Sequence, residues 1–176
     1  MTASQWAVRR VDMLDQRQIH QLADVLIDCV EGGASVHFMS PLRRESALNF
    51  WRQIAQQVAA GERVLLVAED DQGICGTVQL IIHLPENQPH RAEVDKMLVH
   101  RRARRRGLGA ALMRSVETTA RELHKTLLVL DTVTGSDGAR LYEQLGWSRV
   151  GMIPNFALSP HGEFCGATIY YRDLSS

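Results

Sequence analysis

The spacing of apolar residues changes from a helical to a strand-like period near Val64, and this change limits the possible folds more than any other feature of the chain. Upstream of it, apolar residues recur every three or four positions in two segments. They predict a helix that ends at Gly32 and a second helix that begins with an N-cap at Ser40 and ends at Gly61. From Val64 to Ala68 the apolar residues are continuous, as in a strand buried on both faces. Two N-terminal helices therefore precede a sheet.

Strands and helices alternate in the remainder of the chain, where turn residues and prolines separate the apolar segments. The expected elements are, in chain order, a strand over 6–11, the two helices, strands over 64–68, 74–84 and 91–99, a helix over 108–123, a strand over 127–130, a short helix over 136–145, and strands over 147–152 and 167–172. A meander of strands followed by a strand–helix alternation predicts an α/β fold. We expect a single domain over residues 1–176, with a mixed, mostly antiparallel sheet of about seven strands flanked by about four helices.

Composition excludes several classes of protein. Formal net charge is zero at pH 7, which argues against binding of nucleic acid or a membrane through overall charge. No apolar run approaches the roughly 18 residues that span a bilayer, and the first ten residues lack the apolar core of a signal peptide. Three cysteines without a C-x-x-C pair predict reduced thiols, and the histidines lack metal-ligand spacing. We expect a cytoplasmic protein with no metal and with no nucleic-acid or membrane partner.

A glycine-containing loop, RRRGLG at residues 104–109, joins the expected strand 91–99 to the expected helix 108–123. The N-terminus of a helix offers unpaired N–H groups and a partial positive charge. Glycines let the backbone approach a phosphate without a Cβ atom in the way, and arginines supply fork-shaped donors for phosphate oxygens. These features together predict a site for a diphosphate.

The common nucleotide motifs do not fit this loop. A P-loop requires Gly-Lys-Ser/Thr where Ala110 follows Gly109, and a dinucleotide fingerprint requires a third small residue where Leu112 stands. Two alternatives remain open, a solvated basic loop and a nucleic-acid patch over 100–106. The second is less favoured because no aromatic residues are interleaved with the arginines.

The pattern R-x-x-G-x-G at 104–109, after a strand ending in Met-Leu-Val, resembles the acyl-CoA signature of the GNAT superfamily of N-acetyltransferases. The downstream segment ARLYEQLGW at 139–147 resembles a second family motif, A-x-L-Y-E-x-x-G-F. The resemblance implies acetyl-CoA as co-substrate, a primary amine as acceptor, and an oxyanion donor among the backbone N–H groups near residues 98–99. Ser136 stands where many members carry asparagine. The residues implied to bind the cofactor are Met97, Leu98, Val99, Arg104, Arg105, Arg106, Gly107, Leu108, Gly109, Ala110, Ser136 and Tyr142.

A narrower resemblance connects segments 32–39, 91–94, 130–132, 149–151 and 167–170 to the branch of the family that includes tabtoxin resistance proteins. It favours a small amino-acid-like toxin, such as tabtoxinine-β-lactam, as the acceptor. A peptide or protein amine and a non-catalytic acyl-CoA-binding module are the alternatives, and a homodimer is compatible with the family. Loops on a rigid scaffold often form such acceptor pockets. The residues expected to contact the acceptor are Ser35, His37, Phe38 and Glu93.

Acyl transfer from a thioester to an amine needs a proton acceptor for the amine and a partner for the leaving thiolate. The resemblance implies Tyr142 as the thiolate partner, and a phenol with a reference pKa of about 10 is protonated at neutral pH. Asp131, which follows an apolar strand, and Glu93 are equal candidates for the base. Each of these residues also has a purely structural interpretation. Tyr142 could be a core residue, Asp131 a turn or cap residue, and Glu93 a carboxylate paired with Arg91 or Lys96.

Overall fold

Two amphipathic helices, α1 (Gln16–Glu31) and α2 (Arg44–Ala59), precede most of the sheet in the computed structural model, which describes residues 6–175. Residues 1–5, where no signal peptide is expected, lie outside the described residues. A capping box begins α1, because the Asp15 carboxylate accepts from the Gln18 N–H (2.7 Å) while the Gln18 side chain accepts from the Asp15 N–H (2.9 Å). Gly32 ends α1, as predicted.

The predicted start of α2 at Ser40 is wrong, since the N-cap of this helix is Arg43. Ser40 instead belongs to the loop that connects the two helices. Its hydroxyl donates to Glu31 Oε2 (2.8 Å), and the Leu42 N–H donates to Glu31 Oε1 (3.0 Å). The Glu31 carboxylate therefore binds the Ser40 hydroxyl and the Leu42 N–H, so Ser40 does not cap α2. The helix begins at Arg44, four residues after Ser40.

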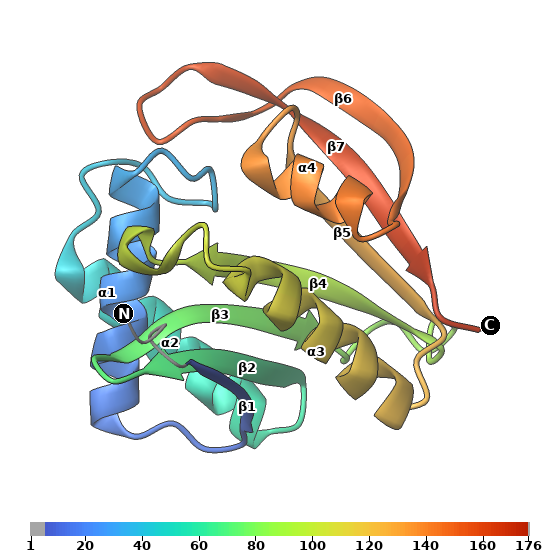
Figure 1. Cartoon of the computed structure of the whole chain (residues 1–176), viewed down its shortest axis with the longest axis horizontal. Helices are drawn as coiled ribbons and strands as arrows, with labels where there is room; N and C mark the ends of the chain where they lie inside the picture. Colours follow the sequence, from blue (N-terminus) through green and yellow to red (C-terminus); the bar gives the residue numbers. More distant parts are fainter. Residues whose placement is uncertain (1–5, 176) are drawn as a thin grey trace.

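The sheet has seven strands in the described part of the chain, in the spatial order β1-β2-β3-β4-β5-β7-β6 (Figure 1). Its strands are β1 (Ala7–Val11), β2 (Arg63–Asp70), β3 (Gly73–Ile81), β4 (Arg91–Val99), β5 (Leu127–Val133), β6 (Ser148–Leu158) and β7 (Phe164–Asp173), and the remaining helices are the 3-10 turn η1 (Arg101–Ala103), α3 (Leu108–Glu122) and α4 (Asp137–Gln144). All neighbouring pairs are antiparallel except β4 and β5. The predicted α/β class, with its mixed seven-stranded sheet and four α-helices, is confirmed.

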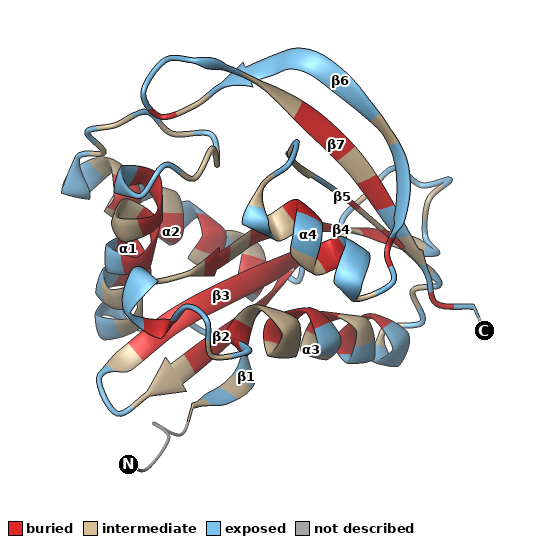
Figure 2. Ribbon diagram, turned by 45° about the horizontal axis from the view of Figure 1, so that its top comes forward, coloured by how far each residue is buried: buried red, intermediate tan, exposed pale blue. Residues whose placement is uncertain are grey.

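The core lies on both faces of the sheet, because successive side chains of a strand point to opposite faces. On β2, Leu65 and Val67 pack with α1 and α2, whereas Val64 and Leu66 pack with α3 and α4. Figure 2 shows β3 buried along most of its length and β6 exposed at the edge of the sheet. None of the helices within residues 6–175 is long and apolar enough to cross a membrane.

The sheet opens between the parallel strands β4 and β5. They pair only from Arg91↔Leu127 to Glu93↔Val129, although β4 continues to Val99 and β5 to Val133. A bulge in β4 accompanies the separation, because one extra residue lies between the partners of Gln79 and Thr77 and Lys96 has a φ of 49°. A bulge bends and twists its strand. The carboxyl ends of the two strands therefore have a space between them.

Candidate active site

A cavity of about 790 Å³ occupies the space between β4 and β5. Phe50 of α2 and Tyr142 of α4 both line it, and these helices cover opposite faces of the sheet. The cavity therefore passes through the opened sheet from one face to the other. Its volume lies within the range of roughly 300–1,000 Å³ that is typical of small-molecule sites. Its position at the carboxyl ends of parallel strands is also where ligands of open α/β sheets bind.

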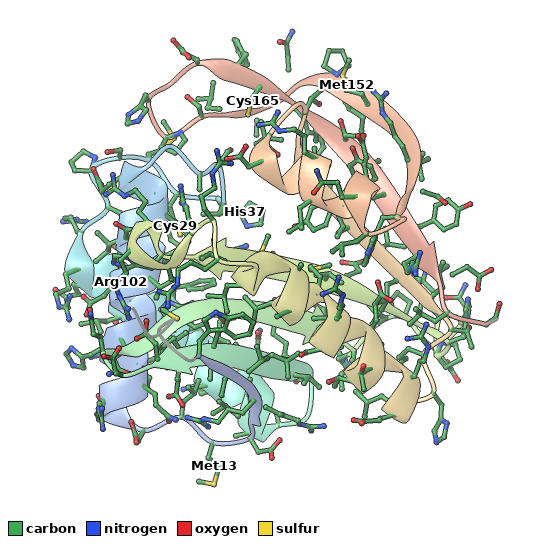
Figure 3. The ribbon with its side chains drawn as sticks, viewed as in Figure 1. Met13, Cys29, His37, Arg102, Met152 and Cys165 are labelled. Carbon is green, nitrogen blue, oxygen red and sulfur yellow. The ribbon has the colours of Figure 1, made fainter. Side chains whose placement is uncertain are left out.

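The structure brings together many of the site residues predicted from sequence. Those that line the cavity are Ser35, His37, Phe38, Glu93, Met97, Asp131 and Tyr142. Figure 3 shows His37 in the space below the hairpin of β6 and β7 that carries Cys165, and His37 is exposed. Leu98, Val99, Ser136 and the loop over 104–110 flank this cavity rather than line it. Leu98 is buried in the core cluster that it shares with α1 and α2.

Helix α4 positions Tyr142 at one end of the cavity. The Ser136 hydroxyl caps this helix by accepting from the Ala139 N–H (3.1 Å), and the Tyr142 ring packs against Trp147 and Tyr170 at centroid distances of 5.9 and 6.0 Å. Burial, and secondarily the negative charge of Asp131, raises the pKa of Tyr142 above its ordinary value. The phenol is therefore a proton donor over the whole neutral range.

The two carboxylates that could act as bases have different surroundings. Glu93 lies at the last position of β4 that pairs with β5, and its Oε1 accepts from Arg91 Nη1 (2.9 Å). The predicted alternative of a Glu93–Arg91 pair is thus present, whereas Lys96 pairs with a different carboxylate. Asp131 is exposed on β5 and forms no ion pair with another residue in the described part of the chain. Both carboxylates can accept a proton from a ligand in the cavity.

A polar cluster, which we call the Lys96 cluster, lies at the α2 end of the cavity and consists of Lys96, Asp95, Arg63, His37 and Gln79. Lys96 and Gln79 are buried, Asp95 and Arg63 are half-buried, and His37 is exposed. The Lys96 ammonium donates to Asp95 Oδ1 (2.9 Å) and to His37 Nδ1 (3.0 Å), which accepts because an ammonium can only donate. Arg63 Nη1 donates to Asp95 Oδ2 (3.1 Å) and to Gln79 Oε1 (2.8 Å). Burial alone would raise the pKa of Asp95, but the neighbouring Lys96 and Arg63 outweigh it and hold this pKa below its ordinary value.

The sequence analysis did not identify Lys96 and Arg63 as site residues. One signal was present, since Asp95 and Lys96 are adjacent charged residues in the middle of an otherwise largely apolar strand. The orientation of Lys96 depends on the bulge at its positive φ, however, and Arg63 reaches Asp95 only because β3 lies between β2 and β4. Neither condition is a local property of the sequence.

The loop that precedes α3 has the backbone of an anion site. Arg105 and Gly107 adopt left-handed conformations with φ of 62° and 78°, as in backbone nests that bind anions. Gly107 is the N-cap of α3, which has no side-chain cap and no acidic residue in its first turn. The first N–H groups of the helix are therefore available for a phosphate. This donor set fits the diphosphate of an acyl-CoA.

Two residues of this loop also make contacts within the protein. A Cβ atom at Gly109 would lie 3.0 Å from Leu141 Cδ2, so the missing side chain also serves the packing of α3 against α4. Arg104 Nε donates to the Val99 carbonyl (3.0 Å) and holds the loop to the end of β4. Arg101 and Arg102 pair with Asp28 and Asp70.

The opened sheet and the anion-binding loop define an α/β domain that takes a diphosphate-bearing cofactor. A model of the acetyltransferase (GNAT) family matches residues 30–147. An uncharacterised N-acetyltransferase from the hisH–hisA intergenic region of Azospirillum brasilense is 32% identical over 126 residues, which are 70% of this chain and 73% of that protein. The chain belongs to the acetyltransferase (GNAT) family and is an N-acetyltransferase that uses acetyl-CoA.

Solved structures share the fold. One is yncA, a proposed acetyltransferase from Salmonella typhimurium solved with its cofactor acetyl-CoA, with a TM-score of 0.77, 17% identity, and coverage of 97% of this chain and 95% of that chain. Another is a ribosomal-protein-alanine N-acetyltransferase from Brucella melitensis, with a TM-score of 0.79, 19% identity, and coverage of 96% and 99%. Within residues 6–175, no group of three or more His, Cys, Asp or Glu residues is placed to hold a metal ion.

Proposed function

We propose that this acetyltransferase acts on the primary amine of a small molecule, and that an amino-acid-like toxin such as tabtoxinine-β-lactam is a candidate acceptor. The observation that carries the proposal is the cavity in the opened sheet, which is bounded on one side by the loop between α1 and α2. This loop is joined to the β6–β7 hairpin, because Ser35 Oγ donates to the Leu158 carbonyl (3.0 Å) and the Ser40 N–H donates to the Pro160 carbonyl (3.0 Å). A small molecule fits a cavity bounded in this way more readily than a polypeptide does.

In the proposed reaction, Tyr142 donates a proton to the sulfur that leaves the acetyl carbon. Either Asp131 or Glu93 accepts the proton that the amine loses when its nitrogen bonds to that carbon. Backbone N–H groups near Leu98 and Val99 stabilise the developing oxyanion. Acetyl-CoA supplies the acetyl thioester. The support for Tyr142 is its position in the cavity and the burial that keeps its phenol protonated.

The proposed cofactor contacts follow the same geometry. Met97 lines the cavity next to the bulge of β4, and the loop over 104–110 supplies N–H groups at the N-terminus of α3. Ser136 remains a proposed contact, although its hydroxyl also caps α4. These positions would hold the thioester arm and the diphosphate at the carboxyl end of β4.

The test is release of free thiol from acetyl-CoA across a panel of small amines, including tabtoxinine-β-lactam, and a matched set of peptides. We expect turnover with at least one small amine. The ribosomal-protein-alanine N-acetyltransferase is named for a protein acceptor. Activity confined to peptides would therefore replace our proposal with that alternative. Binding of acetyl-CoA without turnover on any amine would favour a non-catalytic acyl-CoA-binding module.

We also propose a homodimer formed through the β6–β7 hairpin. β6 is an edge strand, and exposed apolar patches on edge strands often mark protein interfaces. The exposed large apolar residues of the hairpin are Val150, Met152, Ile153, Phe156, Leu158, Phe164 and Tyr171. Light scattering coupled to size-exclusion chromatography should give twice the chain mass, and a monomer at all concentrations would contradict this.

The three cysteines, which form no disulfide, support a proposed cytoplasmic location.

A further inference from the structure

The Lys96 cluster carries charge that acetyl transfer to a simple amine does not require. Lys96 is 3% exposed at its side chain and Arg63 is 17% exposed, and both line the cavity. Asp95 is their shared partner, so one buried and one half-buried cation meet a single carboxylate. Glu93, the next acidic residue on this strand, is already paired with Arg91. Burying an uncompensated cation is costly unless an anion joins it.

The unsatisfied groups of the cluster are donors. Lys96 uses two of its three N–H groups, and the Arg63 bonds within the described residues involve Nη1 only. The Gln79 amide nitrogen is buried without a hydrogen-bond partner among these residues, and its oxygen already accepts from Arg63. Gln79 does not line the cavity, so a ligand there meets the free donors of Lys96 and Arg63. A ligand group that pairs with these donors accepts hydrogen bonds and carries negative charge. A carboxylate meets both conditions.

The charges along the cavity have opposite signs at its two ends. Asp131 lies near Tyr142 at the α4 end, because its charge acts on the pKa of that phenol. Lys96 lies at the α2 end, with its ammonium 5.8 Å from the centre of the Phe50 ring. An acceptor with a cationic or neutral amine at one end and a carboxylate at the other matches this order.

We infer that Lys96 and Arg63 bind a carboxylate of the acceptor, so that the preferred substrates are free amino acids or close analogues rather than simple amines. This inference rests on the proposed small-molecule acceptor and adds the group by which the acceptor is selected. Lys96 and Arg63 are the specificity-determining residues in this scheme. They orient the amine toward Tyr142 and the base without taking part in proton transfer.

The test compares the twenty common L-amino acids with their amides, which keep the amine but lose the charged carboxylate. We expect kcat/KM to be higher for the acid than for its amide by about 10- to 100-fold, the range for one hydrogen bond to a charged group. The amine of the amide is the less basic of the two, so a larger fraction of it is neutral at pH 7.5. A preference for the acid therefore cannot arise from intrinsic reactivity.

The variant Lys96→Met keeps the length and apolar stem of the side chain and removes its charge. We expect the acid-to-amide ratio to fall toward one, through KM, while the Kd of acetyl-CoA stays unchanged. Lys125→Met is the matched control, because the Lys125 ammonium donates to the Pro89 carbonyl (2.7 Å) away from the cavity. This control should keep the wild-type ratio.

The outcomes separate the two proposals. Equal kcat/KM values for acids and amides in the wild-type enzyme would overturn carboxylate binding but leave the small-molecule acceptor in place, and this result does not depend on how any variant folds. Faster turnover of amines without a carboxylate than of the amino acids would likewise overturn carboxylate binding and leave the small-molecule acceptor in place. Turnover of peptides alone would overturn the proposed function together with this inference.

Discussion

The substitution Tyr142→Phe separates the proposed proton donor from its packing role. The phenylalanine ring keeps the contacts with Trp147 and Tyr170, at centroid distances of 5.9 and 6.0 Å in the wild-type protein. The Tyr142 hydroxyl has no hydrogen-bond partner among residues 6–175, so its removal leaves no protein group unpaired. We therefore expect the free energy of unfolding to change by less than about 1 kcal/mol.

The effect on turnover should be much larger. Loss of a positioned general acid lowers kcat by about 10²- to 10⁴-fold, which corresponds to about 2.7–5.4 kcal/mol of activation free energy at 1.36 kcal/mol for each factor of ten. The measurements are thiol release at saturating amine, the Kd of acetyl-CoA by calorimetry, and thermal unfolding. The Kd should remain close to that of the wild type because the diphosphate loop is untouched.

Tyr170→Phe is the matched control. Its ring is buried beside Tyr142, but its hydroxyl donates to Glu143 Oε1 (2.7 Å) and does not line the cavity. This variant should lose about 1–2 kcal/mol of stability and retain kcat, the reverse of the pattern for Tyr142→Phe. A kcat for Tyr142→Phe within about twofold of wild type would refute the assignment of Tyr142 as the proton donor.

Three further predictions follow from named residues. Gly107→Ala should destabilise the protein by about 1–2 kcal/mol, because the left-handed φ of this residue is unfavourable for alanine. The same variant should raise the Kd of acetyl-CoA. An unchanged melting temperature and an unchanged Kd would contradict the anion-site geometry. Asp95→Asn should cost about 3 kcal/mol of unfolding free energy at pH 7, because the buried Lys96 and the half-buried Arg63 lose their carboxylate. Since the pKa of Asp95 is lowered by folding, its stabilisation is present above the unfolded pKa of about 3.9 and is lost as pH falls through the folded value. The difference between wild type and variant in urea melts should therefore narrow below about pH 4, and a constant difference would argue against the charge pairing. The variants Asp131→Asn and Glu93→Gln distinguish the two candidate bases. The variant that removes the base should lose the rising limb of the plot of kcat/KM against pH. Retention of that limb in both variants would indicate that a water path accepts the proton.

Local sequence patterns determined much of the fold. The predicted strand over 91–99 coincides with β4, and the short helix predicted over 136–145 is α4 with Ser136 as its N-cap. Apolar periodicity, capping residues and glycine act over a few neighbouring positions, so they can be read from the chain without knowledge of its tertiary contacts. The loop before α3 was likewise predicted from its glycines, and Gly107 adopts a left-handed φ, which glycine accepts at little cost.

Tertiary structure decided where α2 begins and what surrounds the reacting groups. The sequence around Ser40 is typical of a helix N-cap, but in the folded protein its hydroxyl donates to Glu31 instead. The orientation of Lys96 depends on the bulge in β4, which the local sequence does not reveal. Arg63 contacts Asp95 across β3, although 32 positions separate the two residues in the chain. Strand register, bulges and the parting of β4 from β5 depend on pairing between distant segments. The sequence therefore determined most elements of this acetyltransferase and the glycine-containing loop before α3, whereas long-range packing created the cavity and the Lys96 cluster that lines it.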